Sequence, residues 1–432
     1  MHTLIWRGPL SLSVIFMHTG VKTFDIWLPD ASPQPFFQDI VERMPNITSL
    51  TIRSNVSVKH IEADLEYLIS RLLKLRTITF PQYHITNRIT KALSYLPNLN
   101  VVDFEYPREY GCRNADDVTP YAPDLSENAF PMLCDYSLMV DFDGFSRFLF
   151  SEFAPTNLTS LHVESAIFET VSSVHGLLSM VADTCQMLKS FALVSSSSGI
   201  THAAQVDDAD QYAITFNHLK PVLKMANLRS LEIFHHYPLA LTEEDIEIFA
   251  ASWPSLENLI LNDEPVLLKE SNLTAAALLP FARHCPDLIR LGLFIDSSSV
   301  ELSTCTTSPF VPFKRLQSLS VGVSVINDGN PVALYLSHIL PLGCTVDSEI
   351  SWQGQSLGGD VATYQLISQR KDRWAQVDRL LPLLIGLRID EKARLRVMER
   401  EIDDLRMRNE ILAEHTRSGP SIESNTTTCI VT

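Results

Sequence analysis

The residue types that most often carry chemistry stand together at two places in this sequence, His235–His236 and Arg283–His284–Cys285. A histidine beside a cysteine could serve nucleophilic catalysis, and paired histidines could bind a metal ion. On an extended segment, however, adjacent side chains point to opposite faces, so His235 and His236 are not expected to share a metal. We interpret this pair as a surface or partner-contact element at a strand end. The second group is interpreted as the cationic end of a helix.

A third candidate is the acidic run Asp207, Asp208 and Asp210, within the small and polar stretch Ser195–Gln211. Carboxylates suggest calcium, but the spacing lacks the glycine and the terminal glutamate of an EF-hand loop. The stretch is therefore predicted to be an exposed loop. The sequence also contains no nucleophile elbow, zinc-protease motif, phosphate loop or dinucleotide fingerprint. We expect a protein without catalytic residues, metal ligands or cofactor.

The composition limits the partners that this chain can have. Its 432 residues carry a net charge of -17 and are 45% hydrophobic. Such acidity argues against nucleic acid as a partner, because binding phosphates needs clustered lysine and arginine. Seven scattered cysteines without a CxxC pair predict reduced thiols in a cytoplasmic or nuclear protein. No apolar run is long enough to cross a membrane.

The elements that must position functional residues are indicated by a recurring hexad, in which apolar residues are spaced three and then two apart. Its eleven copies begin at Val21, Ile47, Leu75, Leu99, Leu133, Leu158, Leu188, Leu228, Leu256, Leu288 and Leu316. Most starts lie 24 to 34 residues apart, close to the leucine-rich-repeat period. Each hexad is predicted to form a short strand whose last two apolar residues point inward. One unit cannot close a core alone, but stacked units can.

The stretches between the hexads are predicted to be helices. One of them carries an apolar face formed by Ile61, Leu65, Leu68, Ile69 and Leu72. Another begins with a capping box made by Thr242 and Asp245. Strands that alternate with helices at this period predict an α/β leucine-rich-repeat horseshoe solenoid, with short parallel strands inside and helices outside.

If the function is binding, a protein partner should contact the concave inner face, where outward-pointing positions alternate with the core positions. The predicted partner-binding residues are Asp103, Glu105, His162, Glu164, Glu232, Phe234, Asn258, Asn262, Arg290 and Phe294. Glu232 with Phe234, and Arg290 with Phe294, combine charge with aromatic area, as contact anchors do. We expect an acidic face that suits a basic or mixed partner of unknown identity.

A heptad pattern replaces the hexads near the C-terminus. Its a and d positions are Leu381, Leu384, Arg388, Glu391, Leu395, Met398, Ile402, Leu405, Asn409 and Leu412. The last six are the predicted dimerisation residues of a short coiled coil. Asn409 at an a position, together with attractive charges at the g and e positions, favours a parallel homodimer. The alternative is a single amphipathic helix that folds onto its own horseshoe or projects freely.

These patterns predict four segments. The solenoid covers residues 1–350, a terminal cap or linker 351–372, the amphipathic helix 373–415 and a disordered tail 416–432.

The repeat units "WPSLENLIL" and "CPDLIRLGL", and the ending "ILPLGCTVDSEISW", resemble the leucine-rich half of fungal F-box proteins, especially of mushroom-lineage families. The resemblance covers about residues 1–385. It implies an F-box that binds the adaptor of a cullin–RING ubiquitin ligase, and repeats that hold the substrate. No Leu-Pro-x-Glu-Leu-like opening precedes the repeats. Two hypotheses stay open: an F-box-like interaction scaffold, and an SCF-type substrate receptor whose F-box is missing or degenerate.

Overall fold

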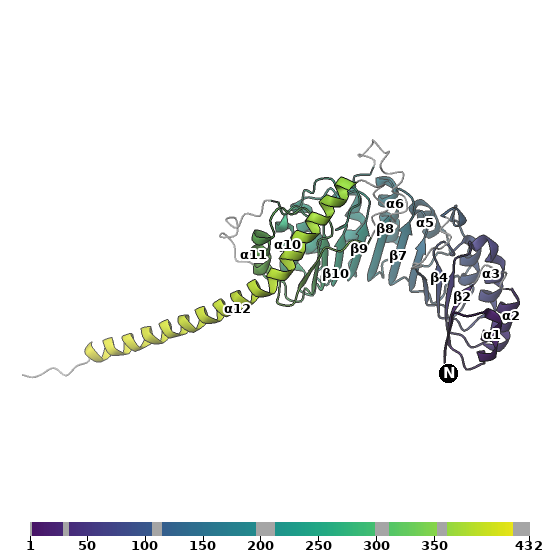
Figure 1. Cartoon of the computed structure of the whole chain (residues 1–432), viewed down its shortest axis with the longest axis horizontal. Helices are drawn as coiled ribbons and strands as arrows, with labels where there is room; N and C mark the ends of the chain where they lie inside the picture. The colour runs from purple at the N-terminus through teal and green to yellow at the C-terminus, as the bar shows by residue number, and fades with distance from the viewer. Residues whose placement is uncertain are drawn as a thin grey trace, which may run out of the picture.

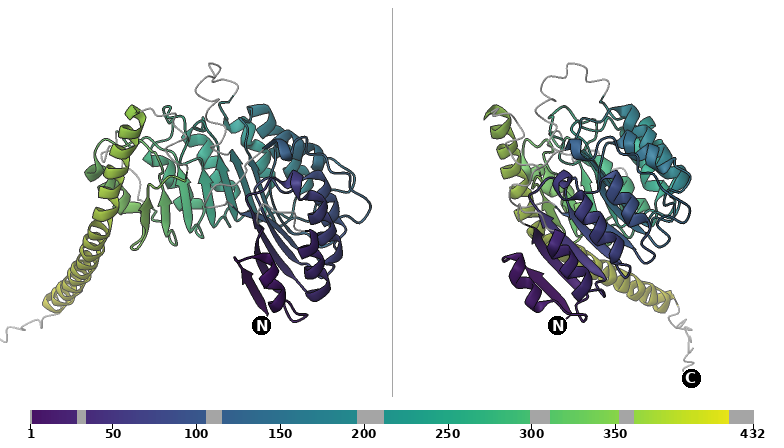
Figure 2. Two further views of the ribbon diagram at one scale, coloured as in Figure 1. Left: turned by 45° about the vertical axis from the view of Figure 1, so that its right-hand side comes forward. Right: turned by 90° about the vertical axis from the view of Figure 1, so that its right-hand side faces the viewer.

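The computed structural model describes residues 2–28, 34–105, 115–195, 212–298, 311–351 and 361–417. Thirteen strands form one sheet in chain order. They are β1 (Thr3–Trp6), β2 (Thr23–Leu28), β3 (Ser49–Ser54), β4 (Thr77–Pro81), β5 (Val101–Glu105), β6 (Asp135–Met139), β7 (Ser160–Ser165), β8 (Ser190–Ser195), β9 (Ser230–Phe234), β10 (Asn258–Leu261), β11 (Arg290–Leu293), β12 (Ser318–Ser320) and β13 (Thr345–Asp347). All the strand pairs are parallel, and the sheet curves into a horseshoe with strands inside and helices outside (Figures 1 and 2).

The eleven predicted hexads all form strands, β2 to β12. In β9, Leu231 and Ile233 are buried, whereas the alternate residue Glu232 is partly exposed. Leu231 is the register partner of Phe191 in β8 and of Leu259 in β10, so equivalent hexad positions stack across the sheet. The predicted leucine-rich-repeat fold is therefore confirmed, with each unit closing the core of its neighbours.

Two strands have no hexad in the sequence analysis. β1 pairs with β2 at one end of the sheet, and β13 pairs with β12 at the other. Each contributes one buried aliphatic residue, Leu4 or Val346. A search for three apolar residues at fixed spacing does not detect strands that bury so little.

The helices cover the outer side of the sheet. They are α1 (Leu10–Ser13), α2 (Gln34–Arg43), α3 (Glu62–Arg71), α4 (Asn87–Ser94), α5 (Phe142–Leu149), α6 (Val171–Thr184), α8 (Phe216–Leu219), α9 (Glu243–Ser252), α10 (Leu278–His284) and α11 (Gly329–Ile339). The predicted capping box opens α9: the Thr242 hydroxyl accepts from the Asp245 amide at 3.3 Å, and the Asp245 carboxylate accepts from the Thr242 amide at 2.9 Å. These bonds satisfy amides that have no partner within the helix.

The C-terminal helix α12 spans Val361–Arg417 and projects from the last repeat (Figure 1). It begins earlier than the predicted helix boundary at residue 373, so the part of the predicted cap or linker from residue 361 onward is helical. The reason is that Ile367 already packs against the solenoid. The predicted loop Ser195–Gln211 and tail 416–432 lie almost entirely outside the described residues. Within the described ranges, no helix has both the length and the apolar composition of a membrane span.

Candidate functional site

Outward-pointing residues of consecutive strands stand in rows across the concave face, because parallel strands pair in register. One row contains Asp103, His162 and Glu232, all partly exposed. Their register partners on a neighbouring strand are Thr79, Ser137 and Ala192. Because these neighbours are small, they leave the charged side chains of Asp103 and Glu232 partly exposed. The row is therefore open to contact by a partner.

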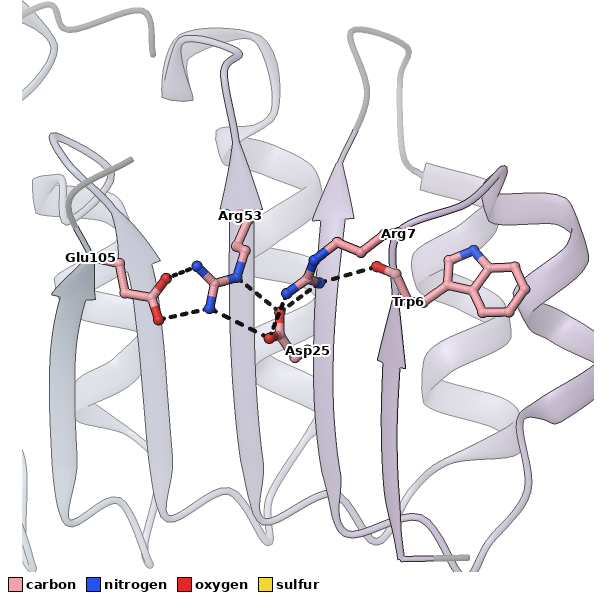
Figure 3. Close-up of polar contacts among 5 residues, drawn as sticks. All are labelled: Trp6, Arg7, Asp25, Arg53 and Glu105. Atoms are coloured by element: carbon pink, nitrogen blue, oxygen red, sulfur yellow. Dashed lines mark hydrogen bonds and ion pairs between the residues drawn. The ribbon is translucent and has the colours of Figure 1, made fainter. Parts of the chain in front are cut away.

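A ladder of four charged side chains crosses the first part of this face, and we call Arg7, Asp25, Arg53 and Glu105 the ion-pair ladder (Figure 3). Arg7 donates to both carboxylate oxygens of Asp25, at 2.9 and 2.8 Å. Arg53 donates its Nε to Asp25 at 3.2 Å and its Nη2 to Glu105 at 2.9 Å. The ladder therefore links strands β2, β3 and β5 and the end of β1.

The electrostatics of the ladder are balanced. Burial alone would raise the pKa of Asp25, but the hydrogen bonds and charges of Arg7 and Arg53 outweigh it, and the pKa lies below its ordinary value. Asp25 is thus ionised at neutral pH. The side chains of Arg7, Arg53 and Glu105 remain 44%, 33% and 37% exposed. Their charged groups are within reach of a bound partner.

Beyond the ladder the charge is not balanced. Asp103 of β5 and Asp135 of β6 form what we call the acidic cluster. Burial raises the pKa of Asp135, and the negative charge of Asp103 raises it further, while a hydrogen bond from Ser160 opposes the shift. The two aspartates therefore repel each other across neighbouring strands. A positively charged group placed between them would relieve this repulsion.

A histidine adjoins the acidic cluster. The ring of His162 lies 5.4 Å from that of Phe104, between centroids. Burial lowers the pKa of His162, and the charge of Asp103 only partly offsets this, so the imidazole is neutral at pH 7. Its Nε2 is buried and has no hydrogen-bond partner among the described residues. Such an atom gains energy when a ligand or a water molecule supplies the missing bond.

The other end of the concave face is covered by its own chain. After β10, residues 262–268 fold back over the sheet, and Val266 packs with Phe294, Val323 and Ile367. Phe294 is only 4% exposed. The predicted outward position of Phe294 on the exposed face was wrong, because this apolar cluster buries its ring.

Gly322 allows the covering segment to approach the sheet. Its φ of +43° suits glycine, and a Cβ at this position would lie 2.3 Å from the carbonyl oxygen of Asp263. The Asp263 carboxylate in turn accepts a hydrogen bond from Ser320, while burial raises its pKa. The contact thus fixes the segment against β12.

Glu264 ties the same segment to the end of the solenoid. Its carboxylate accepts from the Ser351 amide at 2.5 Å and from the Ser351 hydroxyl at 2.6 Å. Burial raises the pKa of Glu264 to about 7, and the charges of Asp263 and Asp347 add to the rise, while the bonds from Ser351 oppose it. Glu264 therefore titrates near neutral pH.

Two further predicted contact residues are also internal. The Asn262 side chain accepts from the His235 amide at 2.9 Å and donates to the Tyr237 carbonyl at 2.6 Å, so it joins two turns and is buried. Glu164 is buried at the end of β7, in register with Met139. Both side chains are buried, so their predicted positions on the exposed face are corrected. Three other predicted residues keep a position on the face: Phe234 and Asn258 are partly exposed and Arg290 is exposed.

The paired histidines are buried, not on the surface as predicted. His236 stacks on Phe168 with 4.2 Å between ring centroids, and its Nδ1 lies 2.9 Å from the Ser195 hydroxyl. Burial lowers the pKa of His235 to about 4. Their ring centroids are 6.0 Å apart. In the described part of the chain, no three His, Cys, Asp or Glu side chains form a group that could hold a metal ion.

His284 and Cys285 use their side chains for separate structural contacts. The His284 Nε2 lies 2.8 Å from Glu247 Oε1. The Cys285 thiol donates to the carbonyl of Ala250 at 3.4 Å, and burial raises its pKa to about 12. A thiol that stays protonated is a poor nucleophile. This arrangement does not support cysteine chemistry.

The sequence analysis missed Arg7, Asp25, Arg53 and Asp135. Asp25 lies between the apolar residues of its hexad and Arg53 directly follows its own, so both occupy outward positions. Aligning the hexads row by row would have placed Asp25 beside Thr51, with Arg53 two residues further along the neighbouring strand and within reach of a long side chain. Arg7 and Asp135 could be found only with the strand register known.

No protein-family model matches the chain, and no curated protein matches its sequence. Among solved structures it is similar to the leucine-rich-repeat-containing protein LegL7 from Legionella pneumophila, with 13% identity and a TM-score of 0.40 over 68% of this chain and 90% of LegL7. It is also similar to a chain of the yeast Rad7 and Elc1 complex (12%, 0.39, covering 78% and 83%) and to a chain of the LRIM1/APL1C complex (12%, 0.30, covering 95% and 69%). The fold assignment rests on this chain's own strand order and register.

Proposed function

We propose that this protein is a non-enzymatic interaction scaffold that binds a basic segment of a partner protein on its concave face, at the acidic cluster. The observation that carries the proposal is the position of Asp103 and Asp135 on the neighbouring strands β5 and β6, where Asp135 is the register partner of Val101 and the two aspartates lie on a diagonal. The negative charge of Asp103 adds to the raised pKa of Asp135. Two like charges close together on neighbouring strands lower the stability of the fold, so the two carboxylates are not explained by a structural role. A lysine or arginine from a partner would turn this unfavourable arrangement into a favourable one.

The surroundings support a basic peptide more than a single cation. The acidic cluster lies between the ion-pair ladder and His162, so a peptide that crosses the strands there would pass the guanidinium of Arg53, then the carboxylates, then the side of β7 that carries His162. Arg53 already forms an ion pair with Glu105. The carboxylates of Asp103 and Asp135 are therefore the ones that would bind the partner's positive charge. The net charge of -17 would also attract a basic partner from a distance.

A peptide-library selection tests the proposal. The full-length chain is immobilised, and phage-displayed peptides are selected at low salt. We expect the bound sequences to be rich in lysine and arginine, and to bind about 10-fold more weakly to the Asp103→Asn/Asp135→Asn double variant. Because amides replace repelling carboxylates, this variant should fold as well as the wild type.

The matched control is Asp183→Asn/Asp287→Asn, which removes the same charge from the outer surface, where these side chains are 61% and 51% exposed. The control variant should select the same kinds of peptide as the wild type and bind them with the same affinity. Peptides without basic residues, or equal weakening by both double variants, would refute a specific acidic site.

The finer alternative is a substrate-recognition subunit of an SCF-type ubiquitin ligase. It is supported by the resemblance of the repeats, such as "WPSLENLIL", to those of fungal F-box proteins. In this role the acidic cluster would hold the substrate. Affinity purification of the tagged chain from the source organism distinguishes the hypotheses. Recovery of the ligase adaptor and a cullin would support the receptor, and their absence beside other specific partners would support the simple scaffold.

A further inference from the structure

Helix α12 consists of two halves with different surroundings. In the first half, Trp374, Val377 and Leu381 are fully buried against the last repeat. Trp374 donates its indole N–H to the Ser324 carbonyl at 3.0 Å, and Asp378 accepts from the Val346 amide of β13 at 2.8 Å. This half closes the open edge of the sheet, as a terminal cap must.

The buried stripe of α12 continues past the solenoid in the same register. Ile367, Trp374 and Leu381 are spaced by seven residues, and the same spacing leads through Arg388 to Leu395 and Ile402. Arg388, which interrupts the apolar heptads, donates to the Ser337 hydroxyl of α11 at 2.6 Å. It is therefore the last contact of this stripe with the body.

Beyond that contact the stripe is exposed. Every residue from Ile389 to Glu414 is exposed, and Leu395, Met398, Ile402 and Leu405 have 48–56% of their area open to solvent. Figure 1 shows this half extending away from the horseshoe. Most of the stability of helices in proteins comes from packing of an apolar face, and this half has no such packing within the described part of the chain. The register of the stripe predicts that another helix covers it.

We propose that the covering helix is residues 391–414 of a second copy of this chain, paired antiparallel in a two-stranded coiled coil. The central layers would set Ile402 against Leu405 of the second copy, and Leu395 against Leu412. The inference is independent of the proposed concave-face function.

Charge complementarity supports this pairing. In the antiparallel register, g positions face g positions and e positions face e positions. Glu401 then meets Arg408 of the second copy, and Glu399 meets Arg406, and each pair occurs twice by symmetry. Both arginines also pair within their own helix, at 3.4 Å for Arg406 with Asp403 and 2.9 Å for Arg408 with Asp404. These are exposed surface pairs, which are individually weak and leave the guanidinium groups accessible.

The position of the solenoid decides the orientation. It occupies the stripe side of α12 as far as Ile385 and Arg388. In a parallel dimer, both solenoids would lie at the same end and on the sides that face each other. In an antiparallel dimer, the solenoid of one copy lies beside only the C-terminal end of the other copy's helix, so the two solenoids do not face each other. Asn409 would favour the parallel form, but in the antiparallel register it lies opposite the flexible Met398, near the end of the layers.

The oligomeric state of the full-length chain tests the dimer. Light scattering after gel filtration, at about 50 µM, should give about twice the chain mass of 48.6 kDa. Ile402→Asp should weaken dimerisation about 100-fold or more, because it places a charge in the central layer. Ile411→Asp is the matched control: the two isoleucines are 48% and 55% exposed, but Ile411 lies off the stripe, and its variant should stay dimeric.

A monomeric wild type, or equal loss of dimer in both variants, would overturn the pairing. Thermal unfolding of the solenoid should be unchanged in both, since neither residue contacts it. The orientation is tested by a spin label placed at position 414 through an unnatural amino acid, which leaves the native cysteines alone. The antiparallel dimer predicts about 30 Å between the labels, and a distance of about 10–15 Å would show a parallel pair and overturn the antiparallel one.

Discussion

The two ends of the concave face use similar residue types in opposite ways. Around β3 to β7, carboxylates and guanidinium groups such as Asp103 and Arg53 stay partly exposed on the face. Around β10 to β12, the carboxylates of Asp263 and Glu264 are buried, because the chain folds back over the sheet. The same solenoid surface is therefore open at one end and closed by its own sequence at the other.

This difference indicates which part of a repeat surface can bind a partner. A strand row supplies contact positions only if the loop that follows leaves them uncovered. At the closed end the polar groups are satisfied internally, for example by Ser320 and Ser351. At the open end Asp103 and Asp135 repel each other, and this repulsion is a reason to place binding there.

The largest effect is expected from forcing the closed end open. Gly322→Ala would place a Cβ against the Asp263 carbonyl at a positive φ, so the covering segment must shift. We expect a loss of about 3 kcal/mol in unfolding free energy. Gly176→Ala is the control: it lies in α6 with no atom near the added Cβ, and it should stabilise by about 0.5–1 kcal/mol. Chemical denaturation measures both, and an unaltered Gly322→Ala protein would contradict the tight approach.

The pH dependence of stability should separate the buried carboxylate from exposed ones. The folded-state pKa of Glu264 is raised to about 7, so its contribution is present at low pH and is lost as the pH rises through about 7. Glu264→Gln should remove about 1–2 kcal/mol of the difference in unfolding free energy between about pH 5 and about pH 8. The control Glu349→Gln, at a side chain 82% exposed, should leave the slope unchanged. If the unfolding free energy of the wild type, Glu264→Gln and Glu349→Gln changed equally with pH, the raised pKa of Glu264 would be contradicted.

The smallest effect is expected at the open end. Asp25→Asn removes the centre of the ion-pair ladder and should cost about 1 kcal/mol at low salt and less at high salt. Because the pKa of Asp25 is lowered, its contribution is present near neutral pH and is lost as the pH falls through the folded-state pKa. Asp183→Asn, at an exposed pair with Lys224, should cost close to nothing. A salt-independent loss at Asp25 would show that packing, not charge, holds the ladder.

Most of the fold could be predicted from the sequence, because its hexads encode the core directly. Even the weakest hexad, at Leu133, forms a strand. The helix bounds and the terminal strands were less predictable. α12 begins before its heptads become regular, since its first turns are held by single contacts such as the one from Arg370 to the Val323 carbonyl at 2.7 Å.

The site was only partly predictable. Asp103 and Glu105 were found because alternation along one strand reveals outward positions. Asn262 and Phe294 were assigned to the surface by the same rule, which takes no account of contacts between distant segments. Asn262 bonds the turn at His235 and Tyr237, and Phe294 packs against Val266, Val323 and Ile367. Asp135 was missed because its importance comes from a neighbour on another strand. Long-range contacts of this kind leave no periodic signal in a sequence.

Site-specific crosslinking tests the central claim most directly. A photoreactive amino acid is placed at Thr79, beside Asp103 on the open end, or at Thr345, an exposed residue of β13 at the far end of the sheet. After irradiation in a lysate of the source organism, the account predicts a specific protein adduct at Thr79 that is lost in the Asp103→Asn/Asp135→Asn background. An adduct at Thr345 alone, or one at Thr79 that persists without the two carboxylates, would contradict it.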